Sequence, residues 1–263
     1  MLRQLSYNPL IRWTVQSTGL QSLARKIYYR CFGPRDGVIK INCLGVSASF
    51  SAVDSRELRQ VEVALVTEQA ALENLLSRLS PGDRFLDVGS EYGVYAILAA
   101  KLVGPAGLTV AVEPYDPSFA VLRKNIGLNH APNVLAFPVA LGDHDGSVGM
   151  SGMRDGKACC ATVTGSGSTV MMRGDDLLAR NHLPPPVMVK IDIEGHEFAA
   201  LEGLHATLTS PVCRTICCEI HPSLLPDGVR PETIIGLIRE YGFTKMEKTR
   251  RGLEIHVLAE KAD

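Results

Sequence analysis

From about residue 67 to its end, the chain alternates between short apolar runs and longer segments with apolar residues three and four positions apart. The short runs are typical of buried strands, and the longer segments are typical of helices. The predicted strands are 85–88, 108–112, 134–140, 187–191, 215–220, 244–248 and 253–259. The predicted helices are 67–79, 94–102, 117–128, 175–179, 196–208 and 231–241. This alternation predicts a doubly wound α/β fold around a mostly parallel sheet.

The first 66 residues follow a different pattern. Residues 8–31 carry an apolar helical face and several basic residues, and no acidic residue occurs among the first 35. Residues 38–44 and 46–50 predict a β-hairpin, and Thr67 is the predicted N-cap of the next helix. We therefore predict an N-terminal helix and hairpin extension over 1–66 and a main domain over 67–263. The basic helix either packs on the main domain or contacts a membrane surface or partner.

Composition narrows the classes of function. The formal net charge of -1 argues against a generally basic nucleic-acid binder. The seven cysteines show no C-x-x-C spacing, which favours free thiols in a reducing cytoplasm. The sequence has neither an apolar run of about 18 residues nor the pattern of a signal peptide. We therefore expect a cytoplasmic protein. If the basic helix contacts a membrane surface, the protein would also be peripherally bound to that membrane.

A glycine turn separates the first strand of the main domain from its helix. Asp87, Gly89 and Gly93 form the pattern D-x-G-x-x-x-G, which differs from a dinucleotide fingerprint and from a phosphate-binding P-loop. Glycines allow unusual backbone dihedrals and close approach of a ligand, and the helix N-terminus favours polar groups. Glu113 ends the next strand, where an acid accepts hydrogen bonds from ribose hydroxyls.

Asp87 distinguishes two adenosine-type ligands. A carboxylate would repel the pyrophosphate of a nicotinamide cofactor, but it would attract the sulfonium and amino groups of S-adenosylmethionine. The missing third glycine also argues against the nicotinamide cofactor. The sequence therefore favours S-adenosylmethionine.

Several segments together carry a family resemblance. They are 87–95 (DVGSEYGVY), 112–114 (VEP), 122–125 (LRKN), 140–143 (ALGD), 190–197 (KIDIEGHE) and 219–222 (EIHP). Over roughly residues 65–260 the chain resembles the FkbM-type methyltransferase family, within the class I S-adenosylmethionine-dependent fold. The resemblance implies a Rossmann-like, seven-stranded sheet and O-methylation of sugars or polyketide-like products.

The resemblance also implies a set of cofactor-binding residues. Asp87, Gly89, Ser90 and Gly93 would surround the methionyl part, and Glu113 would hold the ribose. Ala140 and Leu141 would lie by the adenine, with Asp143 either an acceptor for the adenine amine or a turn residue. The family usually has Ala-Asn where this chain has Ser90-Glu91. Glu91 would then contact the cofactor's amino group or face solvent.

Candidate catalytic residues follow two later strands. Asp192 and Glu194 follow strand 187–191, and Glu219 and His221 end strand 215–220. A base at these carboxyl ends would help remove the proton of an acceptor hydroxyl. We name Asp192 and His221 as the main candidates, with Glu194 and Glu219 beside them. Glu194 has an alternative role in capping the following helix, and so has Glu197.

The function predicted from the sequence is methyl transfer from S-adenosylmethionine to a hydroxyl of a sugar, glycan or natural product. We assign no metal, although a variant in which Asp192, Glu219 and His221 bind a divalent ion ranks lower. An NAD-dependent oxidoreductase and a non-catalytic module that retains the fold are the alternatives from other classes. The acceptor is expected to be a small molecule or glycan.

Overall fold

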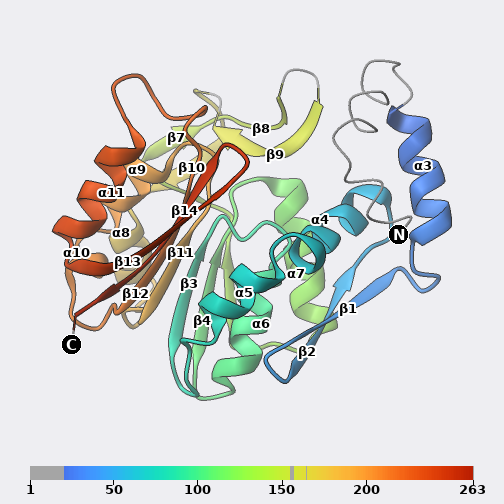
Figure 1. Cartoon of the computed structure of the whole chain (residues 1–263), viewed down its shortest axis with the longest axis horizontal. Coiled ribbons are helices and arrows are strands. Elements are labelled where there is room, and N and C mark those ends of the chain that lie inside the picture. Colours follow the sequence, from blue (N-terminus) through green and yellow to red (C-terminus); the bar gives the residue numbers. More distant parts are fainter. Residues whose placement is uncertain (1–20, 155–156, 164, 263) are drawn as a thin grey trace.

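The computed structural model describes residues 21–154, 157–163 and 165–262. Its centre is a seven-stranded sheet in the order β13–β14–β12–β11–β3–β4–β5 (Figure 1). The strands are β3 (Arg84–Val88), β4 (Leu108–Val112), β5 (Val134–Phe137), β11 (Met188–Ile191), β12 (Thr215–Ile220), β13 (Phe243–Arg251) and β14 (Glu254–Lys261). Strands β12, β11, β3, β4 and β5 are parallel, whereas β14 is antiparallel to both of its neighbours. The predicted α/β fold with a mostly parallel, seven-stranded sheet is confirmed.

Helices cover both faces of this sheet (Figure 1). One face packs against α8 (Gly174–Arg180), α9 (Glu197–Gly203), α10 (His205–Thr209) and α11 (Pro231–Glu240). The other face packs against α4 (Ser55–Val66), α5 (Gln69–Leu76), α6 (Val94–Val103) and α7 (Asp116–Leu128). All residues of β11 are buried, as the continuous apolar run predicts for a central strand covered on both faces.

The strand order reverses beside β3. The chain passes from β3 to β4 on one side, and β11 pairs with the other side of β3. In open α/β sheets, ligands bind at the carboxyl ends of strands where the order reverses. The ends of β3, β4, β11 and β12 are therefore the expected position of the site.

The N-terminal segment packs onto the main domain. It contains α3 (Gln21–Phe32) and the antiparallel hairpin β1 (Val38–Cys43) and β2 (Val46–Ser51), so the hairpin prediction is confirmed. The side chains of Asn125 and Asn129 accept hydrogen bonds from the backbone of β2, each at 2.8 Å. Apolar residues of the hairpin and of α4 share one buried cluster with α5 and α6. Residues on both sides of position 66 thus build one core.

Three predicted elements differ from the observed ones. Thr67 does not begin a helix; it follows the last residue of α4, whose N-terminus is capped by Asp54 through the backbone N–H groups of Arg56 and Glu57. The predicted strand 134–140 ends at Phe137, because Pro138 has no N–H to donate. The predicted helix 196–208 consists of two shorter helices, α9 and α10, which meet at Leu204.

A second layer lies over the carboxyl edge of the main sheet. Strands β6 (Ala140–Leu141), β10 (Thr169–Met172) and β7 (Gly146–Val148) form a three-stranded sheet. The hairpin β8 (Met150–Arg154) and β9 (Lys157–Val163) lies beside it (Figure 1). Sequence patterns did not predict these strands, because they are short and their small apolar cluster is formed by residues far apart in the chain.

Two tyrosines of α3 form hydrogen bonds with the rest of the protein. The Tyr28 hydroxyl donates to Glu62 at 2.6 Å, and the Tyr29 hydroxyl donates to the backbone oxygen of Ala52 at 2.9 Å. Residues 8–20 of the predicted basic helix lie outside the described residues. Over the part of the chain that the structure describes, no helix is long and apolar enough to cross a membrane.

Candidate active site

An open cavity lies at the carboxyl ends of β3, β4 and β11, where the strand order reverses. It encloses about 660 Å³, part of which is open to solvent. Its lining residues come from four regions of the chain: Val88, Gly89 and Glu91; Val112, Glu113, Pro114 and Ser118; Val139, Ala140, Leu141, Met150 and Val163; and Asp192, Ile193, Glu194 and His196. Apolar side chains from the second layer thus face carboxylates from the main sheet.

The glycine turn brings the backbone of β3 next to that of β11. Gly89 has φ of 81°, and a side chain there would collide with the backbone oxygen of Asp192. Gly93 has φ of 80° and precedes the first residue of α6. Ser90 holds the turn closed, because its hydroxyl donates to the backbone oxygen of Asp87 and accepts from the backbone N–H of Val112. The turn needs glycine for both conformation and close packing.

Glu113 and Glu91 form one wall of the cavity. The buried Glu113 carboxylate accepts hydrogen bonds from the backbone N–H groups of Glu91 at 2.8 Å and Tyr115 at 2.9 Å. Burial raises the pKa of Glu113 to about 7, although these two hydrogen bonds favour the charged form. Glu91 has a left-handed backbone with φ of 48°, and its side chain accepts a hydrogen bond from Gln60.

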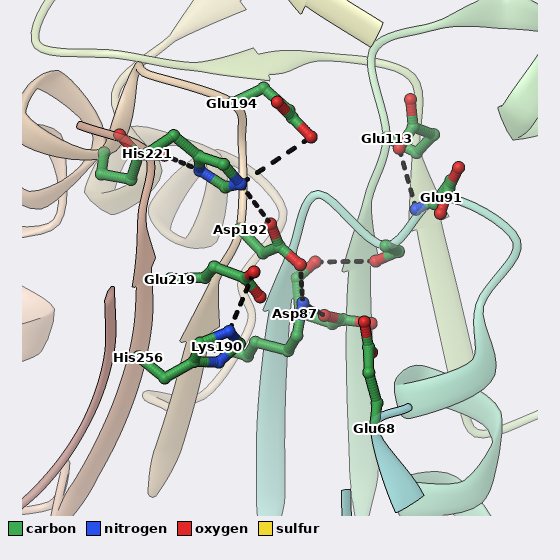
Figure 2. A network of polar contacts seen from close by, with 12 residues as sticks. Glu68, Asp87, Glu91, Glu113, Lys190, Asp192, Glu194, Glu219, His221 and His256 are labelled. Carbon is green, nitrogen blue, oxygen red and sulfur yellow. Dashed lines mark hydrogen bonds and ion pairs between the residues drawn. The ribbon is translucent and has the colours of Figure 1, made fainter. Parts of the chain in front are cut away.

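Burial, and secondarily the nearby Glu113, raises the pKa of Glu91 to about 8. Neither of these carboxylates forms an ion pair with a cationic side chain within the described residues. Figure 2 shows them on the opposite side of the site from the group around His221. This wall can therefore receive hydroxyl or cationic groups of a ligand.

The other predicted cofactor-binding residues occupy different positions. Ala140 and Leu141 in β6 line the cavity. Asp87 is buried beneath the turn and is not among the lining residues. Asp143 is exposed, and its carboxylate lies 2.6 Å from Nδ1 of the neighbouring His144. Asp143 thus takes part in a surface turn.

A buried lysine, Lys190, links the carboxylates of β3 and β11. Its ammonium group donates to Asp192 at 3.0 Å, lies 3.9 Å from Asp87 and lies over the ring of Tyr95. Burial by itself would lower the pKa of Lys190, but Asp192 and Asp87 raise it well above its usual value. Lys190 therefore carries a positive charge that holds the Asp192 side chain in place. Only part of Asp192 is exposed, on the cavity side.

His221 lies between three carboxylates. Its Nδ1 is 2.7 Å from the buried Glu197, and its Nε2 is 3.8 Å from both Asp192 and Glu194 (Figure 2). Burial would lower the pKa of His221, but the hydrogen bond to Glu197 and the charges of Asp192 and Glu194 raise it to about 9. Two candidate residues, Asp192 and Glu194, therefore converge on a third.

Glu219 belongs to a neighbouring ionic group. Its carboxylate lies 3.1 Å from Arg251 and 3.0 Å from His256, and Arg251 also contacts Glu68 at 3.0 Å. Burial would raise the pKa of Glu219, but His256 and Arg251 hold it well below its usual range. The charge of Glu219 is thus neutralised by side chains of the protein itself, as that of Asp192 is by Lys190.

Asp192, Glu219 and His221 each present an atom within 4.8 Å of the others, which is the spacing that a divalent ion needs. Cationic side chains, however, already pair with both carboxylates: Lys190 with Asp192 and Arg251 with Glu219. These fixed positive charges oppose a further cation at the same place.

The sequence assigns no catalytic or binding role to three residues that shape the site. Lys190 has a detectable signal, because it is a charged residue inside an otherwise apolar strand. The sequence favours a helix-capping role for Glu197, and only the fold shows that its carboxylate meets His221. Gln60 carries no signal, because its contact with Glu91 joins residues 31 positions apart.

Comparisons with known proteins point to one family. Residues 87–245, more than half of the chain, match the model of the Methyltransferase FkbM domain. The chain is 27% identical over 199 residues to the hexuronic acid methyltransferase AglP of Haloferax volcanii, which covers 74% of this chain and 77% of that protein.

Solved structures show weaker likenesses. A precorrin-6y C5,15-methyltransferase from Geobacter metallireducens has a TM-score of 0.48 and 16% identity, over 75% of this chain and 91% of its own. A SAM-dependent methyltransferase from Aquifex aeolicus has a TM-score of 0.45 and 15% identity, over 79% and 98%. Both TM-scores lie below 0.5, and the fold assignment rests on the sheet order described above.

Proposed function

The chain belongs to the FkbM methyltransferase domain family, and on this premise we propose that it transfers a methyl group from S-adenosylmethionine to a hydroxyl of a sugar-containing acceptor. The observation that carries the proposal is the pairing of two walls in one cavity. Glu91 and Glu113 form the wall at β3 and β4, and Asp192 with the adjacent His221 forms the wall at β11 and β12.

The residues at β3 and β4 fit S-adenosylmethionine. Each Glu113 oxygen accepts one backbone hydrogen bond and retains a lone pair for a ribose hydroxyl. Glu91 adds a carboxylate for the cationic amino group, and Val112, Val139 and Leu141 offer an apolar surface for adenine. Gly89 leaves the backbone accessible on the same side. We assign these residues to the methyl donor.

The residues at β11 and β12 fit deprotonation of a hydroxyl. S-adenosylmethionine supplies a methyl group on a positively charged sulfur, so the protein mainly has to align the nucleophile and accept its proton. Asp192 projects into the cavity while Lys190 fixes its orientation. Nε2 of His221 lies 3.8 Å from Asp192 and offers a second basic group. We assign both residues to the acceptor side.

The nature of the acceptor is proposed from the relative. AglP is named a hexuronic acid methyltransferase, so we propose a sugar hydroxyl, free or within a glycan or glycoconjugate. The described acceptor side is rich in carboxylates, including Asp192 and Glu194. These would repel an acidic sugar unless its carboxylate points away from them. Neutral sugars are therefore included among the acceptors to be tested.

The proposal is tested in two steps with the purified protein. Isothermal titration should show binding of S-adenosylmethionine and S-adenosylhomocysteine, and no binding of NAD. Mass spectrometry should then show the gain of one methyl group on a uronic-acid glycoside or a neutral sugar, with an amine-bearing sugar analogue as a comparison. Binding of NAD in place of S-adenosylmethionine would refute the donor, and methylation of nitrogen alone would refute the hydroxyl acceptor.

A further inference from the structure

Glu197 is the most deeply buried carboxylate near the cavity, with an exposed fraction of 0%. It lies at the first turn of α9, and its Oε1 accepts a hydrogen bond from the backbone N–H of Gly195 at 2.9 Å. The same oxygen lies 2.7 Å from Nδ1 of His221, which follows β12. One oxygen of Glu197 thus joins the loop after β11 to His221, which lies 24 residues after Glu197 in the sequence.

This contact determines how the imidazole is oriented. A carboxylate oxygen accepts hydrogen bonds, so Nδ1 of His221 must carry the proton that it shares with Glu197. The other ring nitrogen, Nε2, points towards Asp192 and Glu194 on the cavity side (Figure 2). Nε2 lies 3.8 Å from each of these two carboxylates. This distance exceeds a hydrogen-bond length, so neither carboxylate forms a hydrogen bond with Nε2.

We propose that Glu197 is a positioning residue, which holds His221 in the Nδ1–H tautomer so that Nε2 removes the proton of the acceptor hydroxyl. The inference rests on the proposed methyl transfer and adds to it the base, its reacting atom and its tautomer. In this step the acceptor O–H bond breaks and its proton passes to Nε2. The oxygen forms a bond to the methyl carbon, and the carbon–sulfur bond breaks with its electron pair remaining on sulfur.

The same arrangement distinguishes His221 from Asp192. Oδ2 of Asp192 is engaged by Lys190 at 3.0 Å, whereas no hydrogen bond engages Nε2 of His221 among the described contacts. Asp192 is then suited to orient the acceptor and to stabilise the positive imidazolium that forms when His221 takes a proton. His221 is suited to remove the proton, as in other sites where a buried carboxylate orients a histidine.

The charges around His221 also predict a pH dependence. Glu197 faces the ring from α9, and Asp192 and Glu194 face it from the loop after β11. Burial favours the neutral ring, but these carboxylates raise the pKa of His221 to about 9. A base must be unprotonated, so kcat/KM should rise with pH up to about 9. Removal of the Glu197 charge should shift this rise to lower pH.

The first test is independent of activity. Histidine-selective 15N labelling and long-range 1H–15N correlation spectra would report the tautomer of each of the seven histidines, with His221→Asn used to assign the relevant signal. Above its pKa, His221 should carry its proton on Nδ1. A neutral His221 with its proton on Nε2 would overturn the inference, whether or not an acceptor has been found.

The second test compares Glu197→Gln with Glu202→Gln, a matched change on the same helix at a residue outside the cavity lining. Glu197→Gln retains a neutral acceptor for Nδ1, so we expect the tautomer to persist while the rise of kcat/KM moves about one pH unit lower. We expect kcat at high pH to fall roughly tenfold, with little change in the KM for S-adenosylmethionine. Glu202→Gln should behave as the wild type.

A third variant, Glu197→Met, removes the acceptor itself. It should admit the Nε2–H tautomer in the spectra and lower kcat about 100-fold. If Glu197→Gln and Glu202→Gln give the same pH profile, Glu197 has only a structural role and the inference is wrong. If the spectra show the Nδ1–H tautomer but no hydroxyl acceptor is ever methylated, the failure lies in the proposed function and not in the positioning of His221.

Discussion

The two walls of the cavity differ in the partners of their acidic residues. At β11 and β12, Lys190 pairs with Asp192, and Arg251 pairs with Glu219. At β3 and β4, Glu91 and Glu113 receive hydrogen bonds from an amide side chain and from backbone N–H groups. The pKa of Glu219 is held well below its usual range, while that of Glu91 is raised to about 8, mainly by burial.

This difference indicates how the two walls would work. Carboxylates neutralised by the protein's own cations are already fixed in position, which suits residues that must align reacting groups. Buried or half-buried carboxylates without such partners gain most from a ligand that brings hydroxyl groups or a positive charge. The wall at β11 and β12 is thus suited to align the reacting groups, and the wall at β3 and β4 is suited to bind the methyl donor.

The largest effect is expected from Asp192→Asn. The amide keeps the size of the side chain but removes the charge next to Lys190 and His221, so turnover should fall about 10²- to 10⁴-fold. The Kd for S-adenosylmethionine should change less than about threefold, because Asp192 belongs to the other wall. Steady-state kinetics and isothermal titration measure the two quantities. Asp176→Asn on α8, where the side chain is 42% exposed, is the control. Unchanged turnover in Asp192→Asn would remove Asp192 from the catalytic group.

A smaller effect, on binding, is expected from Glu113→Gln. The amide nitrogen would face a backbone N–H, and the acceptor for ribose would be lost, so the Kd for S-adenosylmethionine should rise about 10- to 100-fold. The pKa of Glu113 is about 7, and only the carboxylate form has every acceptor available. The affinity of the wild type should therefore increase as the pH rises through about 7, and this dependence should be absent in Glu113→Gln.

Titrations at several pH values with Glu232→Gln as the control would measure this prediction. Glu232 is exposed on α11 and carries a matched carboxylate. A fall in kcat at saturating S-adenosylmethionine, with unchanged affinity, would place Glu113 on the catalytic side and contradict the division of the two walls.

The smallest effect is expected from Glu91→Gln. If Glu91 holds the amino group of the donor, the variant should bind S-adenosylhomocysteine roughly three- to tenfold more weakly. It should bind 5′-methylthioadenosine, which lacks that amino group, as the wild type does. Equal weakening of both ligands would show that Glu91 only shapes the turn.

Glu91 also predicts a change in stability with pH. Its pKa is raised to about 8 in the folded protein, whereas it is about 4.3 in an unfolded chain. The folded state therefore binds the extra proton between these values, and the contribution of Glu91 to stability declines as the pH rises through that window. Glu91→Gln should gain in Tm relative to the wild type above pH 8. A difference in Tm that does not vary with pH would contradict this explanation.

Much of the fold could be predicted from the sequence because its signals are local. The buried run at 187–191 and the glycine turn after Val88 depend on neighbouring residues, and both match the structure within one residue. Errors occur where the signal depends on contacts. Thr67 resembles an N-cap, but Asp54 begins the preceding helix and places Thr67 at its end. The second layer depends on pairings between β6, β7 and β10, which no local pattern specifies.

The sequence alone determined which strands end in carboxylates and in a histidine, since this follows from the order of residues along each apolar run. It could not determine which charges meet. Lys190 lies between Asp87 and Asp192 because β11 pairs with β3, and Glu197 meets His221 because α9 folds back onto the end of β12. An ion pair or hydrogen bond depends on separation in space, and only the tertiary structure sets the distance between residues far apart in the chain.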